Sequence, residues 1–172
     1  RPDRFPAVVG MSVPYAPRGD FKPTDGLKMA FGENFFYILY FQQPGVAEAE
    51  LEADVAKTMR MLLFSASGDI VRAGDAMTPR PAATTKFLDG MIDPEKLPGW
   101  LAEADLAYFV DEFKRSGFRG GLNWYRNIDR NYELMAAWRA AKVTVPACSS
   151  PARRMSSVRS RPKRPFARTC RT

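Results

Sequence analysis

A short apolar run without polar alternation, residues 7–13, most strongly constrains the fold of this chain. Pro6 precedes the run and Pro14 ends it. Because a half-exposed strand alternates apolar and polar residues, an unbroken run of this length predicts a strand buried on both faces, as in a parallel α/β sheet. A second strand is expected to begin within residues 142–147. The two strands would enclose a long intervening segment.

The intervening segment shows helical rather than strand periodicity, with apolar residues at steps of three and four. The predicted helices cover residues 46–64, 102–116 and 122–134. Residues 15–34 and 69–99 are rich in Pro, Gly and Asp and are expected to be loops, with one short helix near residues 84–88. The aromatic residues of the run 35–41 are expected to lie in the core.

Acidic residues crowd the first turns of the helix predicted over residues 46–64. They are Glu48, Glu50, Glu52 and Asp54. Carboxylates at this end of a helix interact favourably with its dipole, which is the role we expect for them.

The 172 residues include no histidine. A Ser-His-Asp triad, a Cys-His dyad, a histidine metal site and a histidine general base are therefore excluded from this chain. Cys148 and Cys170 predict neither a zinc site nor a disulfide framework. No metal or organic cofactor is implied. The chain also begins with Arg1 rather than Met, so we expect it to be incomplete.

The positive charge of the chain is concentrated at its C-terminal end. The formal net charge is +7, yet residues 149–172 contain seven Arg and one Lys without any acid. Residues 148–172 are therefore expected to form a disordered basic tail, and an out-of-frame origin is one interpretation of it. Such a tail would attract polyanions, but Phe166 is its only aromatic residue, so nucleic acid is disfavoured as a partner. No apolar run approaches the roughly 18 residues of a membrane span, and no secretion signal is recognised, so we expect a cytoplasmic protein.

Two long segments, residues 37–50 (YILYFQQPGVAEAE) and 117–127 (GFRGGLNWYRN), resemble the cap region of soluble epoxide hydrolases of the α/β-hydrolase superfamily. Residues 100–106 resemble the helix that precedes the second segment in that family. The resemblance runs from about residue 1 to residue 147. It implies an α/β fold, mainly a helical cap inserted between two parallel strands. We therefore expect the chain to divide into four parts: residues 1–14 form a core strand, 15–140 the cap, 141–147 the start of the next strand and 148–172 the tail.

The resemblance also implies a reaction and the residues that assist it. Family members open an epoxide by attack of an aspartate, and a water activated by a His-acid pair hydrolyses the resulting ester to a vicinal diol. Two cap tyrosines hydrogen-bond the epoxide oxygen, and the matching positions here are Tyr37 and Tyr125. Phenols suit this role because they are neutral donors at pH 7. Phe35 and Trp124 flank the tyrosines and are candidates for lining a substrate pocket.

Several interpretations stay open at this stage. The nucleophilic aspartate and the histidine of the family are not recognisable in this sequence, so the chain alone is expected to be inactive. An inactive remnant is the main alternative to an epoxide hydrolase, and a polyanion binder acting through the tail is a weaker one. A dehalogenase of the same superfamily is disfavoured by the paired tyrosine motifs.

Overall fold

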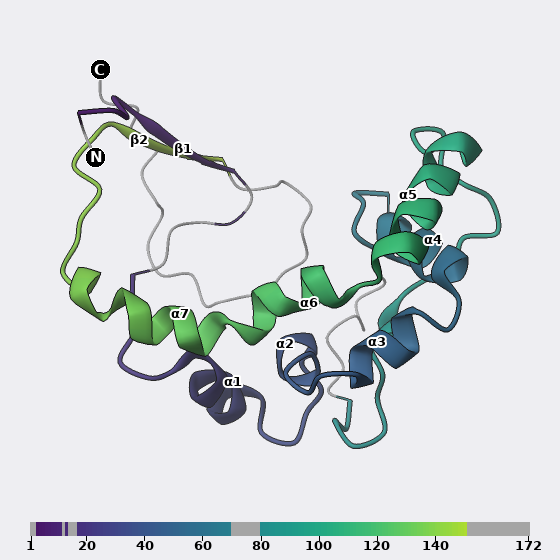
Figure 1. Ribbon diagram of the computed structural model, residues 1–172, viewed down its shortest axis with the longest axis horizontal. Coiled ribbons are helices and arrows are strands. Elements are labelled where there is room, and N and C mark those ends of the chain that lie inside the picture. The colour runs from purple at the N-terminus through teal and green to yellow at the C-terminus, as the bar shows by residue number, and fades with distance from the viewer. Residues whose placement is uncertain (1–2, 12, 14–16, 70–79, 151–172) are drawn as a thin grey trace. The chain divides into compact units, whose positions relative to one another are not determined.

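The structure, a computed structural model, describes residues 3–11, 13, 17–69 and 80–150. Its helices are α1 (Pro23–Phe31), α2 (Tyr37–Tyr40), α3 (Val46–Leu51), α4 (Val55–Ser65), η1 (Leu88–Gly90), α5 (Glu103–Ser116), α6 (Arg119–Arg126), α7 (Ile128–Leu134) and η2 (Met135–Trp138), and its strands are β1 (Val8–Met11) and β2 (Ala147–Ser150) (Figure 1). The chain divides into two compact units. One consists of residues 19–134, and the other combines residues 1–18 with residues 135–172.

The unit of residues 1–18 and 135–172, called the strand unit below, contains a two-stranded parallel sheet in which Val8 pairs with Ala147 and Met11 with Ser150. Two parallel strands were predicted, but the second begins at Ala147, whereas residues 142–147 were expected to start it. Pro146 has no N–H and so cannot donate to the sheet. Its carbonyl still accepts a hydrogen bond from the Val8 N–H at 3.0 Å, and the paired residues begin directly after it. Cys148–Ser150 therefore belong to a strand and not to the predicted tail. The rest of that tail, residues 151–172, lies outside the described residues.

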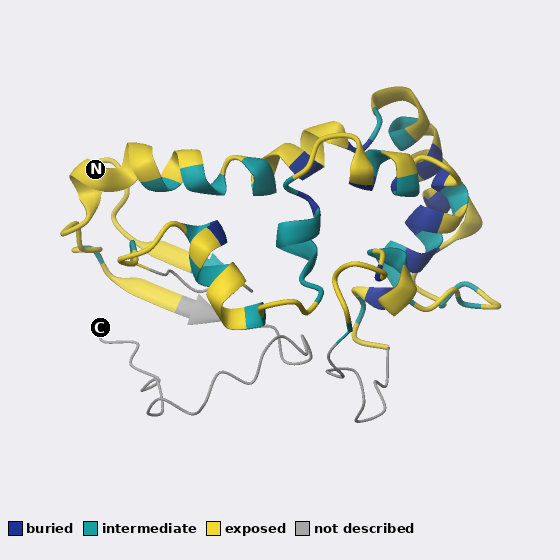
Figure 2. Cartoon of the chain, turned by 90° about the horizontal axis from the view of Figure 1, so that it is seen from below, coloured by how far each residue is buried: buried dark blue, intermediate teal, exposed yellow. Residues whose placement is uncertain are grey.

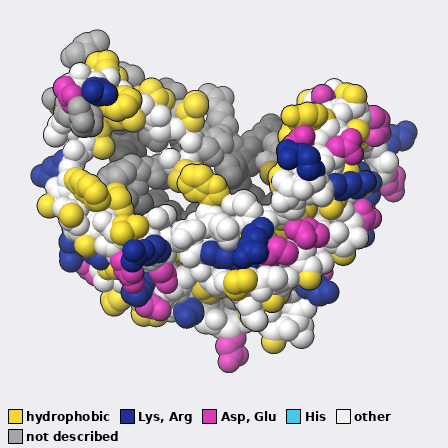
Figure 3. Space-filling model, in the orientation of Figure 1, with side chains coloured by type: hydrophobic (Ala, Val, Ile, Leu, Met, Phe, Trp, Pro, Cys, Tyr) yellow, Lys and Arg dark blue, Asp and Glu magenta, His cyan; other side chains and the backbone are white. Residues whose placement is uncertain are grey.

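The prediction of a strand buried on both faces is wrong for β1. Val9 is 62% exposed and Met11 is 77% exposed, and Figure 3 shows hydrophobic side chains at the surface over this strand. The physical reason is that the described part of the sheet contains two strands, so the apolar residues lack the neighbouring layers that their pattern requires.

The unit of residues 19–134, called the helical unit below, has an apolar core formed mostly by residues of α3 to α6, and buried residues are dark blue in Figure 2. Its buried members are Phe41, Ala47, Leu51, Val55, Met59, Leu106, Val110, Phe118 and Leu122. α4 and α5 lie side by side and supply four of them (Figure 1). The helix predicted over residues 102–116 is confirmed. Gly117 ends it at φ 67°, and the Gly117 N–H donates to the Phe113 carbonyl at 2.8 Å. A positive φ directly after a helix favours glycine, because it has no Cβ to strain the turn.

Two predicted helices are each divided in the structure. The helix expected over residues 46–64 is α3 and α4. Asp54 leaves the helical conformation and its carboxylate accepts from the Lys57 N–H at 3.0 Å. A side chain that accepts in this way begins a new helix. The helix expected over residues 122–134 is α6 and α7, with Asn127 between them.

The expectation of a loop over residues 15–34 is also wrong, because α1 occupies residues 23–31. Pro23 stands at the start of α1, where its missing N–H costs nothing. The Thr24 N–H and hydroxyl both donate to the Asp129 carboxylate of α7, at 3.0 and 2.5 Å. The helix thus depends on a partner more than 100 residues away in the sequence.

No described helix is long and apolar enough to cross a membrane. Within the described ranges, no group of three or more His, Cys, Asp and Glu side chains is placed to hold a metal ion.

Candidate active site

The structure brings Tyr37 and Tyr125 together. Tyr37 is the first residue of α2, and Tyr125 lies near the C-terminal end of α6. Their ring centroids are 5.6 Å apart and the ring planes meet at 83°. This is the edge-to-face arrangement that aromatic pairs prefer. Both side chains are half-buried. The two positions that the family resemblance selected, 88 residues apart in the sequence, therefore form one pair.

Two phenylalanine rings lie close to this pair. The buried Phe41 ring lies 5.6 Å from Tyr37 and 5.2 Å from Tyr125, and the Phe87 ring lies 6.2 Å from Tyr37. Burial, and to a smaller extent the neighbouring Tyr125, raises the pKa of Tyr37 above its ordinary value of 10.0. The Tyr37 phenol consequently stays protonated at neutral pH and keeps its hydrogen to donate.

The hydroxyl groups of the pair differ from those of two other tyrosines. The Tyr40 hydroxyl donates to Glu50 at 2.7 Å, and the Tyr132 hydroxyl donates to the Asp20 carbonyl at 3.0 Å. Among the residues that the structure describes, neither the Tyr37 nor the Tyr125 hydroxyl has a hydrogen-bond partner. Two adjacent phenols with uncommitted donors can both serve one acceptor oxygen.

Phe35 and Trp124 are not brought into ring contact with the pair within the described residues. The Arg80 guanidinium lies over the Phe35 ring at 5.3 Å from its centroid, and Tyr40 is a second neighbour at 5.5 Å. The Trp124 side chain is 79% exposed. Their role as pocket-lining residues therefore stays a prediction. A surface hollow of about 650 Å³ beside Arg60 includes none of these four residues.

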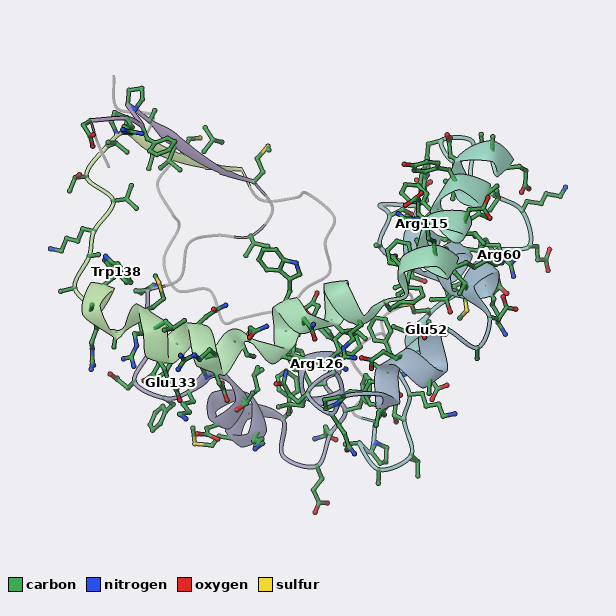
Figure 4. The ribbon with its side chains drawn as sticks, in the orientation of Figure 1. Glu52, Arg60, Arg115, Arg126, Glu133 and Trp138 are labelled. Carbon is green, nitrogen blue, oxygen red and sulfur yellow. The ribbon has the colours of Figure 1, made fainter. Side chains whose placement is uncertain are left out.

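Two residues that the sequence analysis did not single out bind backbone carbonyls close to the pair. The Gln42 side-chain amide donates to the Tyr125 carbonyl at 3.0 Å and to the Ile38 carbonyl of α2 at 2.8 Å. The Arg126 guanidinium donates to the Phe41 carbonyl at 2.8 Å, and Figure 4 shows Arg126 between α6 and α2. Both residues stand inside the two recognised segments, which is the signal that could have drawn attention to them.

The acidic residues of α3 and the residue that follows it also have specific partners. The Glu48 carboxylate accepts from Arg126 at 2.6 and 2.8 Å. Glu50 accepts from the Phe87 and Leu88 N–H groups at 3.2 and 2.9 Å. Glu52 accepts from the Phe118 N–H at 3.0 Å. The carboxylates predicted only to favour the helix dipole therefore bind two other segments, α6 with the residue before it and the backbone at residues 87 and 88.

Comparison with known proteins gave a consistent result. The chain is 45% identical over 147 residues to epoxide hydrolase A of Mycobacterium tuberculosis, a match covering 84% of this chain and 45% of that protein. Epoxide hydrolase 1 of Siraitia grosvenorii is 38% identical over 148 residues, covering 85% of this chain and 44% of the relative. The chain belongs to the epoxide hydrolase family of the α/β-hydrolase fold.

Solved structures of this family agree with the fold. The crystal structure of epoxide hydrolase A from Mycobacterium thermoresistibile is 46% identical, with a TM-score of 0.76 over 86% of this chain and 46% of that one. An epoxide hydrolase from Vigna radiata is 35% identical, with a TM-score of 0.64 over 87% of this chain and 43% of that one. The expected α/β-hydrolase fragment is thereby confirmed. No model of a known protein family matches the sequence. The chain spans less than half the length of the curated relatives it matches.

Proposed function

We propose that Tyr37 and Tyr125 donate hydrogen bonds to the oxygen of a small organic epoxide, within an epoxide hydrolase that converts the epoxide to a vicinal diol. The observation that carries the proposal is the edge-to-face pair itself, at 5.6 Å, with neither hydroxyl bonded to another described residue. Charge develops on the epoxide oxygen as the ring opens, and donors already oriented toward that oxygen lower the barrier.

The protonation state of the pair fits this role. Because burial raises the pKa of Tyr37 above 10.0, its phenol is neutral at pH 7 and does not carry a charge that would repel the developing alkoxide. A phenol is also a weak enough acid to avoid permanent transfer of its proton to the bound epoxide. The Tyr37 phenol therefore acts as a neutral donor throughout ring opening.

The hydrolysis of an ester intermediate is the second step of the proposed reaction. The chain contains no histidine, so the water that hydrolyses an ester intermediate is not activated by a histidine of these 172 residues. We infer that this chain supplies the epoxide-oxygen donors and that the nucleophile and base belong to other parts of the enzyme. A cytoplasmic location and the pocket-lining roles of Phe35 and Trp124 remain predictions within this proposal. We propose no metal or organic cofactor for the reaction.

Binding of styrene oxide to the 172-residue chain tests the proposal directly. With tyrosine labelled at its hydroxyl-bearing carbon, NMR follows the Tyr37 and Tyr125 signals as the epoxide is added. We expect both signals to shift in a saturable manner, and we expect Tyr37→Phe or Tyr125→Phe to weaken the binding measured at the remaining tyrosine. Tyr108, which is 65% exposed, provides the matched control variant Tyr108→Phe, which should bind as the parent does.

Two outcomes would contradict the proposal. The first is a shift confined to tyrosines other than Tyr37 and Tyr125, which would place the epoxide elsewhere. The second is binding that both phenylalanine variants leave unchanged, which would show that neither hydroxyl contacts the epoxide oxygen.

A further inference from the structure

Arg126 follows Tyr125 directly on α6, and its side chain is only 11% exposed. The guanidinium donates to the Phe41 carbonyl at 2.8 Å, to the Gln43 carbonyl at 3.3 Å and to both oxygens of Glu48 at 2.6 and 2.8 Å. We call Arg126 and these three acceptor residues the arginine clamp. Consecutive residues on a helix point in directions about 100° apart, so the clamp does not occupy the ring position of Tyr125.

The acceptors of the clamp belong to the segment that carries Tyr37. Phe41 directly follows α2, whose first residue is Tyr37, and Gln43 lies in the turn that leads to α3. The bonds of Arg126 therefore join the end of α6 to the end of α2. The backbone at Tyr125 is also joined to this segment through Gln42, which donates to the Tyr125 carbonyl at 3.0 Å.

The chemistry of the clamp requires arginine. Two backbone carbonyls and one carboxylate are reached by a single planar group, which has five donors in a fixed fork. A lysine ammonium offers three donors on one nitrogen and can pair with Glu48 without spanning the carbonyls. Glu48 is itself fixed, because its carboxylate accepts from the Gly45 N–H at 2.9 Å at the start of α3.

We propose that Glu48 and Arg126 are positioning residues that set the separation and angle of the Tyr37 and Tyr125 rings. The proposal rests on the function proposed above for the two hydroxyls. It goes further because it assigns the control of their geometry to a charged pair that touches neither hydroxyl. A displacement of about 1 Å in a catalytic group can cost about a hundredfold in rate, so such control matters to the reaction.

The test compares Arg126→Lys with a core variant that lowers stability at a different place. Met59 is 5% exposed on α4. Met59→Ala removes apolar contacts from the helical core and keeps every hydrogen-bond donor and acceptor of the clamp. Both variants are studied in the full 172-residue chain at a temperature where circular dichroism shows each to be folded. The readouts are the nuclear Overhauser contact between the Tyr37 and Tyr125 rings and the titration of the Tyr37 phenol, and neither requires a substrate.

We expect Arg126→Lys to lose the contact between the two rings and to lower the pKa of Tyr37 toward its ordinary value, since a displaced ring is more hydrated. Met59→Ala should keep both features of the parent chain. Retention of the contact in Arg126→Lys would overturn the proposal, because the clamp would then affect stability alone. Loss of the contact in both variants would also overturn it, because the ring geometry would then follow overall stability.

These outcomes are separable from those of the proposed function. If styrene oxide fails to bind the parent chain, the donor role fails, while the ring contact still reports on the clamp. If the epoxide binds through both tyrosines but Arg126→Lys keeps the ring contact, the positioning role fails and the donor role stands.

Discussion

Replacing Glu48 with glutamine removes one charge from the arginine clamp while keeping the size of the side chain. Hydrogen bonds from Arg126 lower the pKa of Glu48 from 4.5 to about 2, against the opposing effect of burial, and backbone N–H groups add to the lowering. Since one pKa unit corresponds to about 1.4 kcal/mol, the ionised carboxylate stabilises the folded chain by at most about 3.5 kcal/mol. The Glu48 side chain is 13% exposed. Solvent therefore screens this pair less than a surface pair.

The sign of the pH dependence follows from the lowered pKa. A carboxyl group whose pKa is lower in the folded than in the unfolded chain contributes its full stabilisation above the unfolded value, here 4.5. The contribution is lost as the pH falls from that value through about 2. The difference in unfolding free energy between the parent and Glu48→Gln should therefore be largest at neutral pH and should shrink across this acidic range.

Urea unfolding followed by far-ultraviolet circular dichroism, at neutral pH and at several points down to about pH 2, measures this difference. The matched control is Glu112→Gln, because Glu112 is 43% exposed and pairs with Arg115, which is 72% exposed, on the surface of α5. An exposed pair of this kind contributes less than about 0.5 kcal/mol. The reasoning fails if Glu48→Gln costs no more than the control, or if its cost is the same at both ends of the pH range.

Further measurements test the remaining parts of the structure. Tyr37 should titrate above 10.0 in an ultraviolet difference spectrum, and Tyr125→Phe should lower that pKa because Tyr125 contributes to raising it; an unchanged titration would show that the two phenols do not interact. Val9 is 62% exposed on a strand of a two-stranded sheet. Because charge on such a strand opposes edge pairing, Val9→Lys should reduce self-association in sedimentation velocity, and equal association of both chains would refute this. The 172-residue chain should form no diol from styrene oxide above the uncatalysed rate, and turnover that Tyr37→Phe abolishes would reveal a nucleophile within it. In a full-length enzyme containing this segment, Tyr125→Phe should slow ring opening roughly a hundredfold in single-turnover experiments, and an unchanged rate would exclude the donor role.

The local sequence determined the features that depend on neighbouring residues. Regular spacing of Leu106, Val110 and Phe113 followed by Gly117 was sufficient for α5, because a helix and its glycine cap are formed by residues close in the chain. The two recognised segments likewise identified Tyr37 and Tyr125. Apolar residues at positions 8–11 correctly predicted a strand, although they could not show that the described sheet leaves them exposed.

Tertiary structure decided the features that depend on partners distant in the sequence. Glu52, which directly follows α3, accepts from the Phe118 N–H, and no local pattern contains that partner. Glu48 is an acidic residue near the start of a helix, as expected of a residue that stabilises the helix dipole. Its bonds to Arg126, 78 residues away, nevertheless join two helices. A carboxylate near the start of a helix interacts favourably with the helix dipole whatever its distant neighbours are, so the sequence alone predicts this local role. Which donor it binds, and which phenols lie side by side, is decided only when the chain has packed.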